Sequence, residues 1–249
     1  MRIAEHIAAL DEEGVRLEEA AGRAGLDAHV ATCPGWQVRD LLRHVSGVHR
    51  WAMAHVITGR RQPYSTREEA EFFAEVHDDE LLDWFRKGHR ALVDTLAAAD
   101  ESMRCWTFLP APSPLAFWAR RQAHETAIHR ADAESAVSTV PYWDPSFAAD
   151  GIDELLNGFF GRPGGRLVAD PPLSMALVPT DIEAGWTFSI EPAGLRLVAS
   201  EMPAQLTIVG PASELYLMLW NRSGTERLET RGDAAVLDLW RTRATITWD

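Results

Sequence analysis

The strongest constraint on the fold is a helical spacing of apolar residues that recurs throughout the first 140 residues. In the first segment Ile3, Ile7 and Leu10 lie three or four positions apart, so they share one side of a helix. Three more segments have the same period and are separated by stretches containing proline and glycine; they cover about 36–59, 78–99 and 115–137. Helices that are each apolar on one side predict an antiparallel four-helix bundle.

Beyond Val140 and Pro141 the apolar pattern changes to short runs that are typical of strands. A helix is expected first, at 146–160, and another after Pro211, at 212–221. The predicted strands cover 174–179, 186–190, 195–200, 205–209 and 244–248. We therefore predict an α+β protein with two domains: the bundle in residues 1–140 and a small α+β domain with a mostly antiparallel sheet in residues 141–249.

The composition excludes several classes of protein. The 249 residues include 24 Lys+Arg and 37 Asp+Glu, and the resulting net charge of −13 argues against binding to nucleic acid or to an anionic membrane. No apolar run approaches the ~20 residues that span a bilayer, and residues 1–6 lack the apolar core of a signal peptide, so we expect a cytoplasmic protein. Two cysteines, Cys33 and Cys105, are too few for a disulfide scaffold or a thiolate zinc site.

All nine histidines lie in the first 129 residues, which directs the search for metal or acid–base chemistry to the predicted bundle. Glu125 and His129 are four positions apart on the fourth predicted helix, so they share a face and are able to bind one ion together. The same spacing also occurs in ordinary surface pairs. His124 and His129 are five positions apart, which does not match the spacing of the zincin motif.

His44 is the third candidate ligand, because it lies on the apolar stripe of the second predicted helix, between Leu41 and Val48. A polar ring there must be satisfied, either by a metal or by a hydrogen bond within the core. Two imidazoles and one carboxylate leave an open coordination position, as catalytic metal sites do. His55 lies three turns away, too far for the same ion, and the histidines expected in surface or loop positions are His29, His49, His77 and His124.

Three further residues are candidates for catalysis, and each has a structural alternative. Arg121 lies four positions before Glu125 and could bind a substrate carboxylate or pair with Glu125 itself. Asp132 lies three positions after His129 and could orient that ring or be a surface acid. Arg222 could reach a substrate across a cleft between the domains or be a solvated arginine at a helix end.

Two blocks of sequence resemble those of the mycothiol-dependent maleylpyruvate isomerase family. They are residues 33–44, CPGWQVRDLLRH, and residues 124–132, HETAIHRAD, and the likeness extends over nearly the whole chain. The resemblance implies a DinB-like four-helix bundle followed by a smaller α+β domain. It also implies that His44, Glu125 and His129 hold a divalent metal, usually zinc, and that mycothiol is the thiol cosubstrate.

The resemblance further implies a reaction. A metal lowers the pKa of a thiol at its open position, and the thiolate could isomerise maleylpyruvate by addition and elimination, or end as an S-transfer to another small electrophile. Two alternatives stay open: a non-catalytic, metal-stabilised binding or regulatory module, and a metal hydrolase that needs no thiol. We expect a monomer or weak homodimer. Its single lysine, Lys87, suggests the GC-rich genome of an actinobacterium.

Overall fold

The computed structural model describes residues 1–73, 75–162, 164–199 and 202–246. The chain divides into two compact units, Met1–Pro141 and Tyr142–Asp249. Within the described ranges, no helix is both long enough and apolar enough to cross a membrane.

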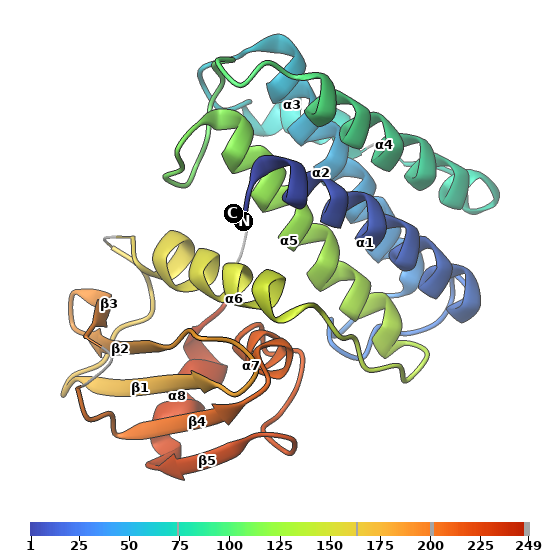
Figure 1. Ribbon diagram of the computed structural model, residues 1–249. Helices are drawn as coiled ribbons and strands as arrows, with labels where there is room; N and C mark the ends of the chain where they lie inside the picture. Colours follow the sequence, from blue (N-terminus) through green and yellow to red (C-terminus); the bar gives the residue numbers. More distant parts are fainter. Residues whose placement is uncertain (74, 163, 200–201, 247–249) are drawn as a thin grey trace. The chain divides into compact units, whose positions relative to one another are not determined.

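The first unit is a bundle of four long helices, as the periodicity predicts (Figure 1). Helix α1 packs against α5 and α4, and α2 packs against α4 and α5. The short helices α3 and η1 lie in the connection between α2 and α4. The bounds are Ile3–Ala24 for α1, Val38–Thr58 for α2, Thr66–Ala70 for α3, Glu71–Phe73 for η1, Asp78–Ala98 for α4 and Pro114–Ser135 for α5.

Helix α5 differs from the other long helices because it is buried on nearly all of its sides. Alanines recur at every fourth position along it, from Ala119 to Ala131, and all of them are buried. Small side chains at this spacing let a neighbouring helix approach closely. Charged residues of α5 are buried too, and Arg130 joins α5 to α1 through Glu13, with 2.6 Å between Nε and Oε2. Helix α5 thus brings polar groups into the interior of the bundle.

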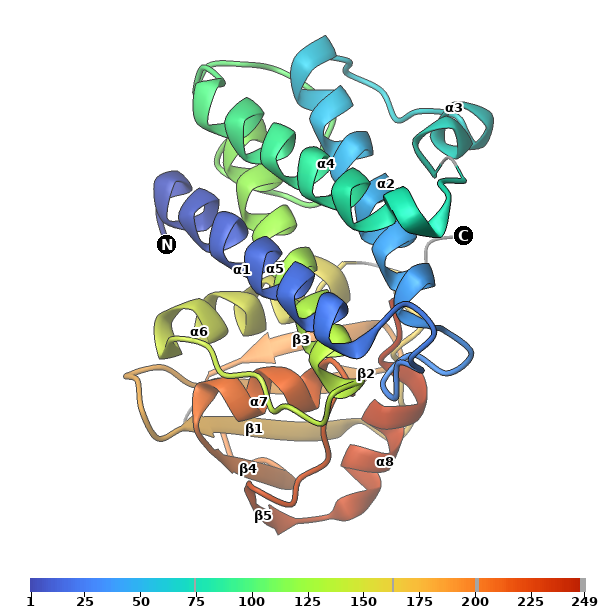
Figure 2. The same ribbon diagram turned by 90° about the vertical axis from the view of Figure 1, so that its right-hand side faces the viewer.

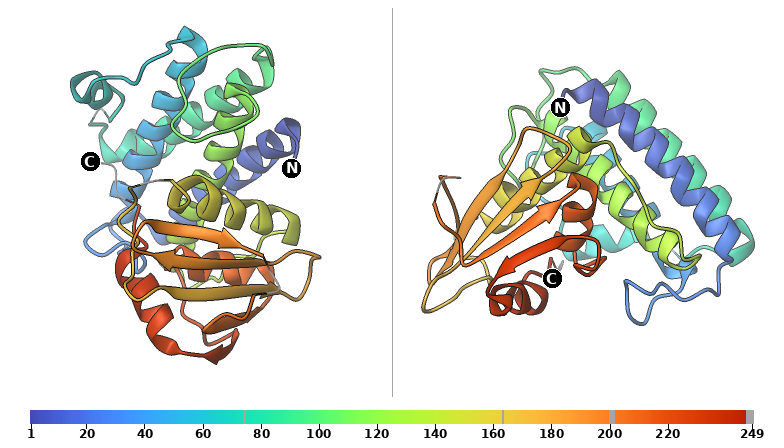
Figure 3. Two further views of the ribbon diagram at one scale, coloured as in Figure 1. Left: turned by 90° about the vertical axis from the view of Figure 1, so that its left-hand side faces the viewer. Right: turned by 60° about the horizontal axis from the view of Figure 1, so that its bottom comes forward.

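The second unit is built around a mixed sheet of five strands in the order β3-β2-β1-β4-β5 (Figure 3). Only β1 and β4 are parallel neighbours, so the sheet is mostly antiparallel, as predicted. Met175 at the centre of β1 pairs with Phe188 of β2 on one side and with Leu206 of β4 on the other. The strands are β1, Leu173–Pro179; β2, Trp186–Glu191; β3, Gly194–Val198; β4, Leu206–Gly210; and β5, Glu229–Gly232.

Helices complete the second unit. Helix α6, Pro145–Asp153, continues into the π-helical η2, Glu154–Phe160, which agrees with the single helix predicted at 146–160. Helices α7, Ala212–Leu219, and α8, Ala234–Arg243, both pack on β1 and β4 (Figure 2).

The C-terminal part of the second unit differs from the prediction. The expected strand at 244–248 is wrong for 244–246, which form no strand, while 247–248 lie outside the described residues. The edge strand β5 and helix α8 were not predicted. All residues of β5 are exposed, and its sequence, Glu-Thr-Arg-Gly, has no apolar residue to mark a strand. Its strand conformation comes from pairing with β4, where Thr230 faces Ile208.

Candidate metal centre

Helices α2 and α5 bring His44, Glu125 and His129 together inside the first unit. Oε1 of Glu125 lies 3.5 Å from Nε2 of His44 and 3.2 Å from Nε2 of His129. One ligand atom of each residue lies within 4.8 Å of those of the other two. The three residues chosen from the sequence therefore converge, in a position where they could hold one ion.

Local sequence signals fix where the two helices begin. Helix α2 follows Gln37, whose backbone N–H donates to the carboxylate of Asp40 at 2.9 Å. Helix α5 follows Ser113, whose hydroxyl accepts from the N–H of Ala116 at 3.1 Å, and Pro114 occupies its first position. Such caps satisfy N–H groups that the first turn of a helix leaves without partners. They set the ends of the two elements that carry the ligands.

The candidate ligands are themselves held by further polar groups. Nδ1 of His129 donates to Oδ2 of Asp132 at 2.9 Å, and Thr32 donates to Oδ1 of the same fully buried carboxylate at 2.5 Å. Both ring nitrogens of His129 therefore face carboxylate oxygens. The buried guanidinium of Arg121 donates to Oε2 of Glu125 at 3.3 Å. For each of these two residues the structure shows one of the two predicted alternatives. Asp132 contacts the ring of His129, and Arg121 pairs with Glu125.

The electrostatics of the cluster favour a positive charge between the carboxylates. Burial alone would raise the pKa of Glu125, but hydrogen bonds from the two histidines and the charge of Arg121 outweigh burial and hold that pKa well below its ordinary value. Burial alone would lower the pKa of His129, but hydrogen bonds to Asp132 and Glu125 raise it to about 9. The cluster thus combines an ionised carboxylate with a ring that is stabilised as a cation.

This donor set fits a divalent transition metal such as zinc. Two imidazole nitrogens and one carboxylate oxygen form a common catalytic zinc site, with a fourth position left for a ligand. A carboxylate on the second nitrogen of a ligating histidine, as Asp132 provides for His129, is typical of such sites and orients the ring. The buried negative charge of Glu125 also favours a bound cation.

Two aromatic rings, Trp36 and Phe73, lie against the histidines of the cluster. The ring of Trp36 lies 5.2 Å from that of His44 and stacks on His129 at 6.5 Å with an interplanar angle of 14°. The ring of Phe73, at the end of η1, lies 6.2 Å from that of His44. The sequence placed Trp36 in the same block as His44, but no spacing or pattern pointed to Phe73.

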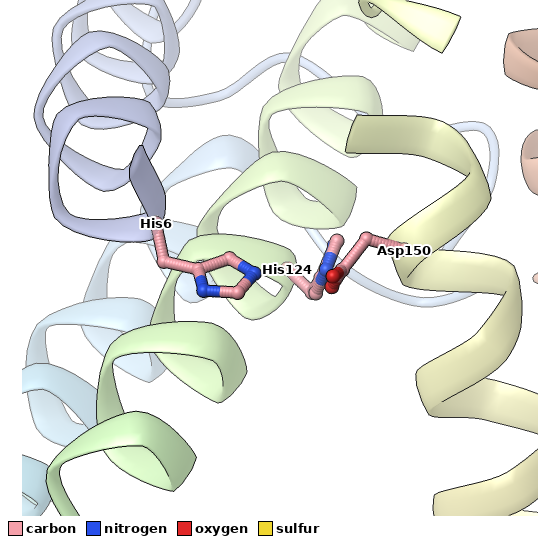
Figure 4. A group of neighbouring side chains, drawn as sticks. All are labelled: His6, His124 and Asp150. Carbon is pink, nitrogen blue, oxygen red and sulfur yellow. The ribbon is translucent and has the colours of Figure 1, made fainter. Parts of the chain in front are cut away.

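Two histidines expected in surface or loop positions are buried in the bundle, so that prediction is wrong for them. His49 is fully buried, with Nε2 at 2.9 Å from Oγ1 of Thr126. His124 is fully buried too, and its ring meets that of His6 edge-on at 6.0 Å (Figure 4). His124 was missed because α5 is buried on nearly all sides, whereas His49 lies on α2 and faces Thr126 of α5. His29 and His77 are exposed, as expected.

Arg222, the third catalytic candidate, belongs to the second unit. It follows α7, is half-buried, and donates from Nη1 to the carbonyl oxygen of Trp220 at 3.1 Å. The three candidate metal ligands all belong to the first unit. A role for Arg222 in binding substrate stays a prediction.

Fold and site together define a class of two-domain protein: a helical bundle with a largely buried His–Glu–His cluster, followed by a domain with a mixed sheet. The family model "Mycothiol maleylpyruvate isomerase N-terminal domain" matches residues 7–134, and "MDMPI C-terminal domain" matches residues 146–239. The chain belongs to the mycothiol-dependent maleylpyruvate isomerase family.

Solved structures agree with this assignment at the level of the fold. The chain is similar to the crystal structure of the mycothiol-dependent maleylpyruvate isomerase, with a TM-score of 0.62 and 12% sequence identity over 92% of this chain and 93% of the other. A histidine-to-alanine mutant of that enzyme gives the same values. No match was found among curated proteins.

Proposed function

We propose that the protein is a divalent-metal enzyme that uses mycothiol as its thiol cosubstrate. The observation that carries the proposal is the convergence of His44, Glu125 and His129, with their ligand atoms within 4.8 Å of one another. Family membership supports mycothiol as the thiol. The chemistry is cis–trans isomerisation of a maleylpyruvate-like substrate, or transfer of the thiol to a small electrophile.

The ligand residues would hold zinc or another divalent metal. When bound, such a metal lowers the pKa of a thiol at its open position, so that thiolate is available near neutral pH. Asp132 keeps the ring of His129 oriented, with Nδ1 turned to the carboxylate and Nε2 turned to Glu125. Arg121 helps to keep Glu125 ionised, and a role for its guanidinium in binding a substrate carboxylate stays a prediction.

The proposed isomerisation conserves all atoms. The thiolate sulfur forms a bond to one carbon of the double bond, and the electron pair of that double bond moves onto the conjugated carbonyl. The former double bond is then single and rotates. Its re-formation expels the thiolate and leaves the trans isomer. In the transfer reaction the adduct instead takes up a proton and keeps the new carbon–sulfur bond.

The test is incubation of zinc-loaded protein with mycothiol and a panel of electrophiles that includes maleylpyruvate, followed by mass spectrometry and chromatography of isomers. We expect thiol-dependent product that disappears when a chelator removes the metal. The matched control is Glu125→Gln, which keeps the size of the side chain but removes its charge. Turnover without any thiol would indicate a metal hydrolase instead. The absence of product from every electrophile, with metal present, would indicate a binding module.

A further inference from the structure

An exposed phenylalanine lies against one of the candidate metal ligands. Phe73 is 43% exposed, although it is a large apolar residue. Its ring is 6.2 Å from that of His44, with an angle of 32° between the ring planes. His44 is also the most exposed of the three ligands: its side chain is 24% exposed, compared with 12% for His129 and 11% for Glu125. Phe73 therefore stands where the cluster meets solvent.

Helix α2 provides a slot for this ring at Gly47. A Cβ atom at Gly47 would lie 2.2 Å from Cδ1 and 2.5 Å from Cε1 of Phe73, which no side chain tolerates without displacing the ring. Gly47 lies three positions after His44, on the same side of the helix. Glycine destabilises the interior of a helix relative to alanine. Its presence here is explained by the space that Phe73 occupies.

The segment that carries Phe73 is fixed to the loop before it. The backbone N–H of Ser65 donates to Oε2 of Glu68 at 2.7 Å, and Oε1 of Glu68 accepts from Arg60 at 2.7 Å. The neighbouring ring, Phe72, packs against Tyr64 at 5.1 Å. These contacts place Phe73 in a defined position on the bundle.

A second ring completes an aromatic wall, which we define as Trp36 and Phe73. Trp36 approaches His44 at 5.2 Å from the loop before α2, whereas Phe73 approaches it from η1. Two rings from separate parts of the chain thus contact the same ligand at the solvent-facing side of the cluster. Neither of them is needed to hold a metal, because both lack ligand atoms suited to one.

We propose that this aromatic wall binds the planar, conjugated part of the molecule that reaches the open position of the metal centre, and that Phe73 determines the specificity for it. Flat π-systems pack on aromatic rings by stacking or edge-to-face contact, and they gain more from it than flexible aliphatic groups do. The inference rests on the proposed metal centre. It does not depend on mycothiol being the thiol, so the two proposals can fail separately.

The test uses two metal-binding probes that differ only in the group attached to the same head: benzohydroxamate, which is planar and aromatic, and acetohydroxamate, which carries a methyl group. Their dissociation constants are measured by calorimetry on the zinc-loaded protein. We expect Phe73→Ala to weaken benzohydroxamate binding about tenfold, the scale of one lost aromatic contact, and acetohydroxamate binding less than about twofold. Gly47→Ala, which displaces the ring but keeps Phe73, should also reduce the ratio of the acetohydroxamate dissociation constant to the benzohydroxamate dissociation constant.

Phe72→Ala is the matched control, because its ring packs on Tyr64 and should leave the ratio of the two constants unchanged. Zinc content and circular dichroism establish that each variant is folded and loaded. Equal weakening of both probes by Phe73→Ala, or no change in either, would overturn the proposal. Preserved selectivity for benzohydroxamate without any mycothiol-dependent turnover would reject the proposed function while retaining the aromatic wall.

Discussion

Two histidines of α2, His44 and His55, end in opposite surroundings. His44 lies in the first half of α2 with the candidate metal ligands, a region that we call the metal end of the bundle. Its Nε2 lies 3.5 Å from the carboxylate of Glu125. His55 lies in the last turn of α2, in a region that we call the aromatic end. It is fully buried, and neither of its ring nitrogens has a hydrogen-bond partner among the described residues. Four rings lie within 5.3 Å of its own, measured between ring centroids: Trp51, Tyr64, Trp106 and Trp118.

The two ends show what burial does to an imidazole with and without an acidic partner. At the aromatic end, burial, assisted by the charge of Arg60, lowers the pKa of His55 to about 4. At the metal end, burial acts on His129 in the same direction, yet Asp132 and Glu125 raise its pKa to about 9. A buried histidine by itself is therefore no sign of a cation site. The buried carboxylates distinguish the metal end.

The largest expected difference between the two ends is their response to zinc. A metal that binds only the folded state at 1,000 times its dissociation constant adds about 4 kcal/mol to the free energy of unfolding. We expect this gain in the wild type and in His55→Phe, but not in His44→Ala. Urea denaturation with zinc and with a chelator measures it. An equal gain in both histidine variants would remove the distinction between the ends.

The second largest expected effect is on zinc affinity, and it concerns Asp132, whose carboxylate contacts the candidate ligand His129. Asp132→Asn keeps the shape of the side chain but removes the charge that faces Nδ1 of His129. We expect zinc affinity to fall about 10- to 100-fold, as is usual when the carboxylate behind a ligating histidine is lost. Competition with a chromophoric chelator measures the affinity. Asp94→Asn, at an exposed position of α4, is the control, and equal affinities for the two variants would contradict the role of Asp132.

The smallest expected effect is on the pH dependence of stability, to which His55 at the aromatic end contributes. His55 has a folded-state pKa of about 4, below the unfolded value of 6.5, so its contribution to stability is full above pH 6.5 and is lost as the pH falls toward 4. His55→Phe should therefore lose less stability than the wild type as the pH falls from 6.5 to about 5, by about 1–2 kcal/mol. Denaturation in chelator at several pH values measures this without metal release. The control is the exposed His29→Phe, and identical pH dependence of His55→Phe and wild type would contradict the assignment.

The metal end could be predicted from sequence because two of its three candidate ligands lie four positions apart on one helix. Glu125 and His129 share a helix face through their spacing, and the apolar stripe of α2 turns His44 toward the interior. Phe73 could not be predicted, because the segment between α2 and α4 has no periodicity and the position of its ring depends on packing against Gly47 of α2. The burial of His124 also escaped prediction, because α5 has no polar side to reveal its orientation.

The same limit applies to the second unit. Alternation or apolar runs identified strands β1 to β4, whose buried residues face the core. Strand β5 exists through pairing with β4 alone, so its own residues carry no signal. Local patterns thus predicted most of the elements that bury their own apolar faces and missed β5, which depends on its partner strand. Helix α8 was missed as well, although it buries Val236, Leu237 and Trp240.

The central claim is that His44 and Glu125, with His129, hold one divalent metal. Elemental mass spectrometry of the purified wild type, His44→Ala, Glu125→Ala and His55→Phe, each dialysed against zinc and then against metal-free buffer, tests it most directly. We predict about one equivalent of zinc in the wild type and in His55→Phe, and little in the other two. A full equivalent of zinc in both His44→Ala and Glu125→Ala would contradict the claim.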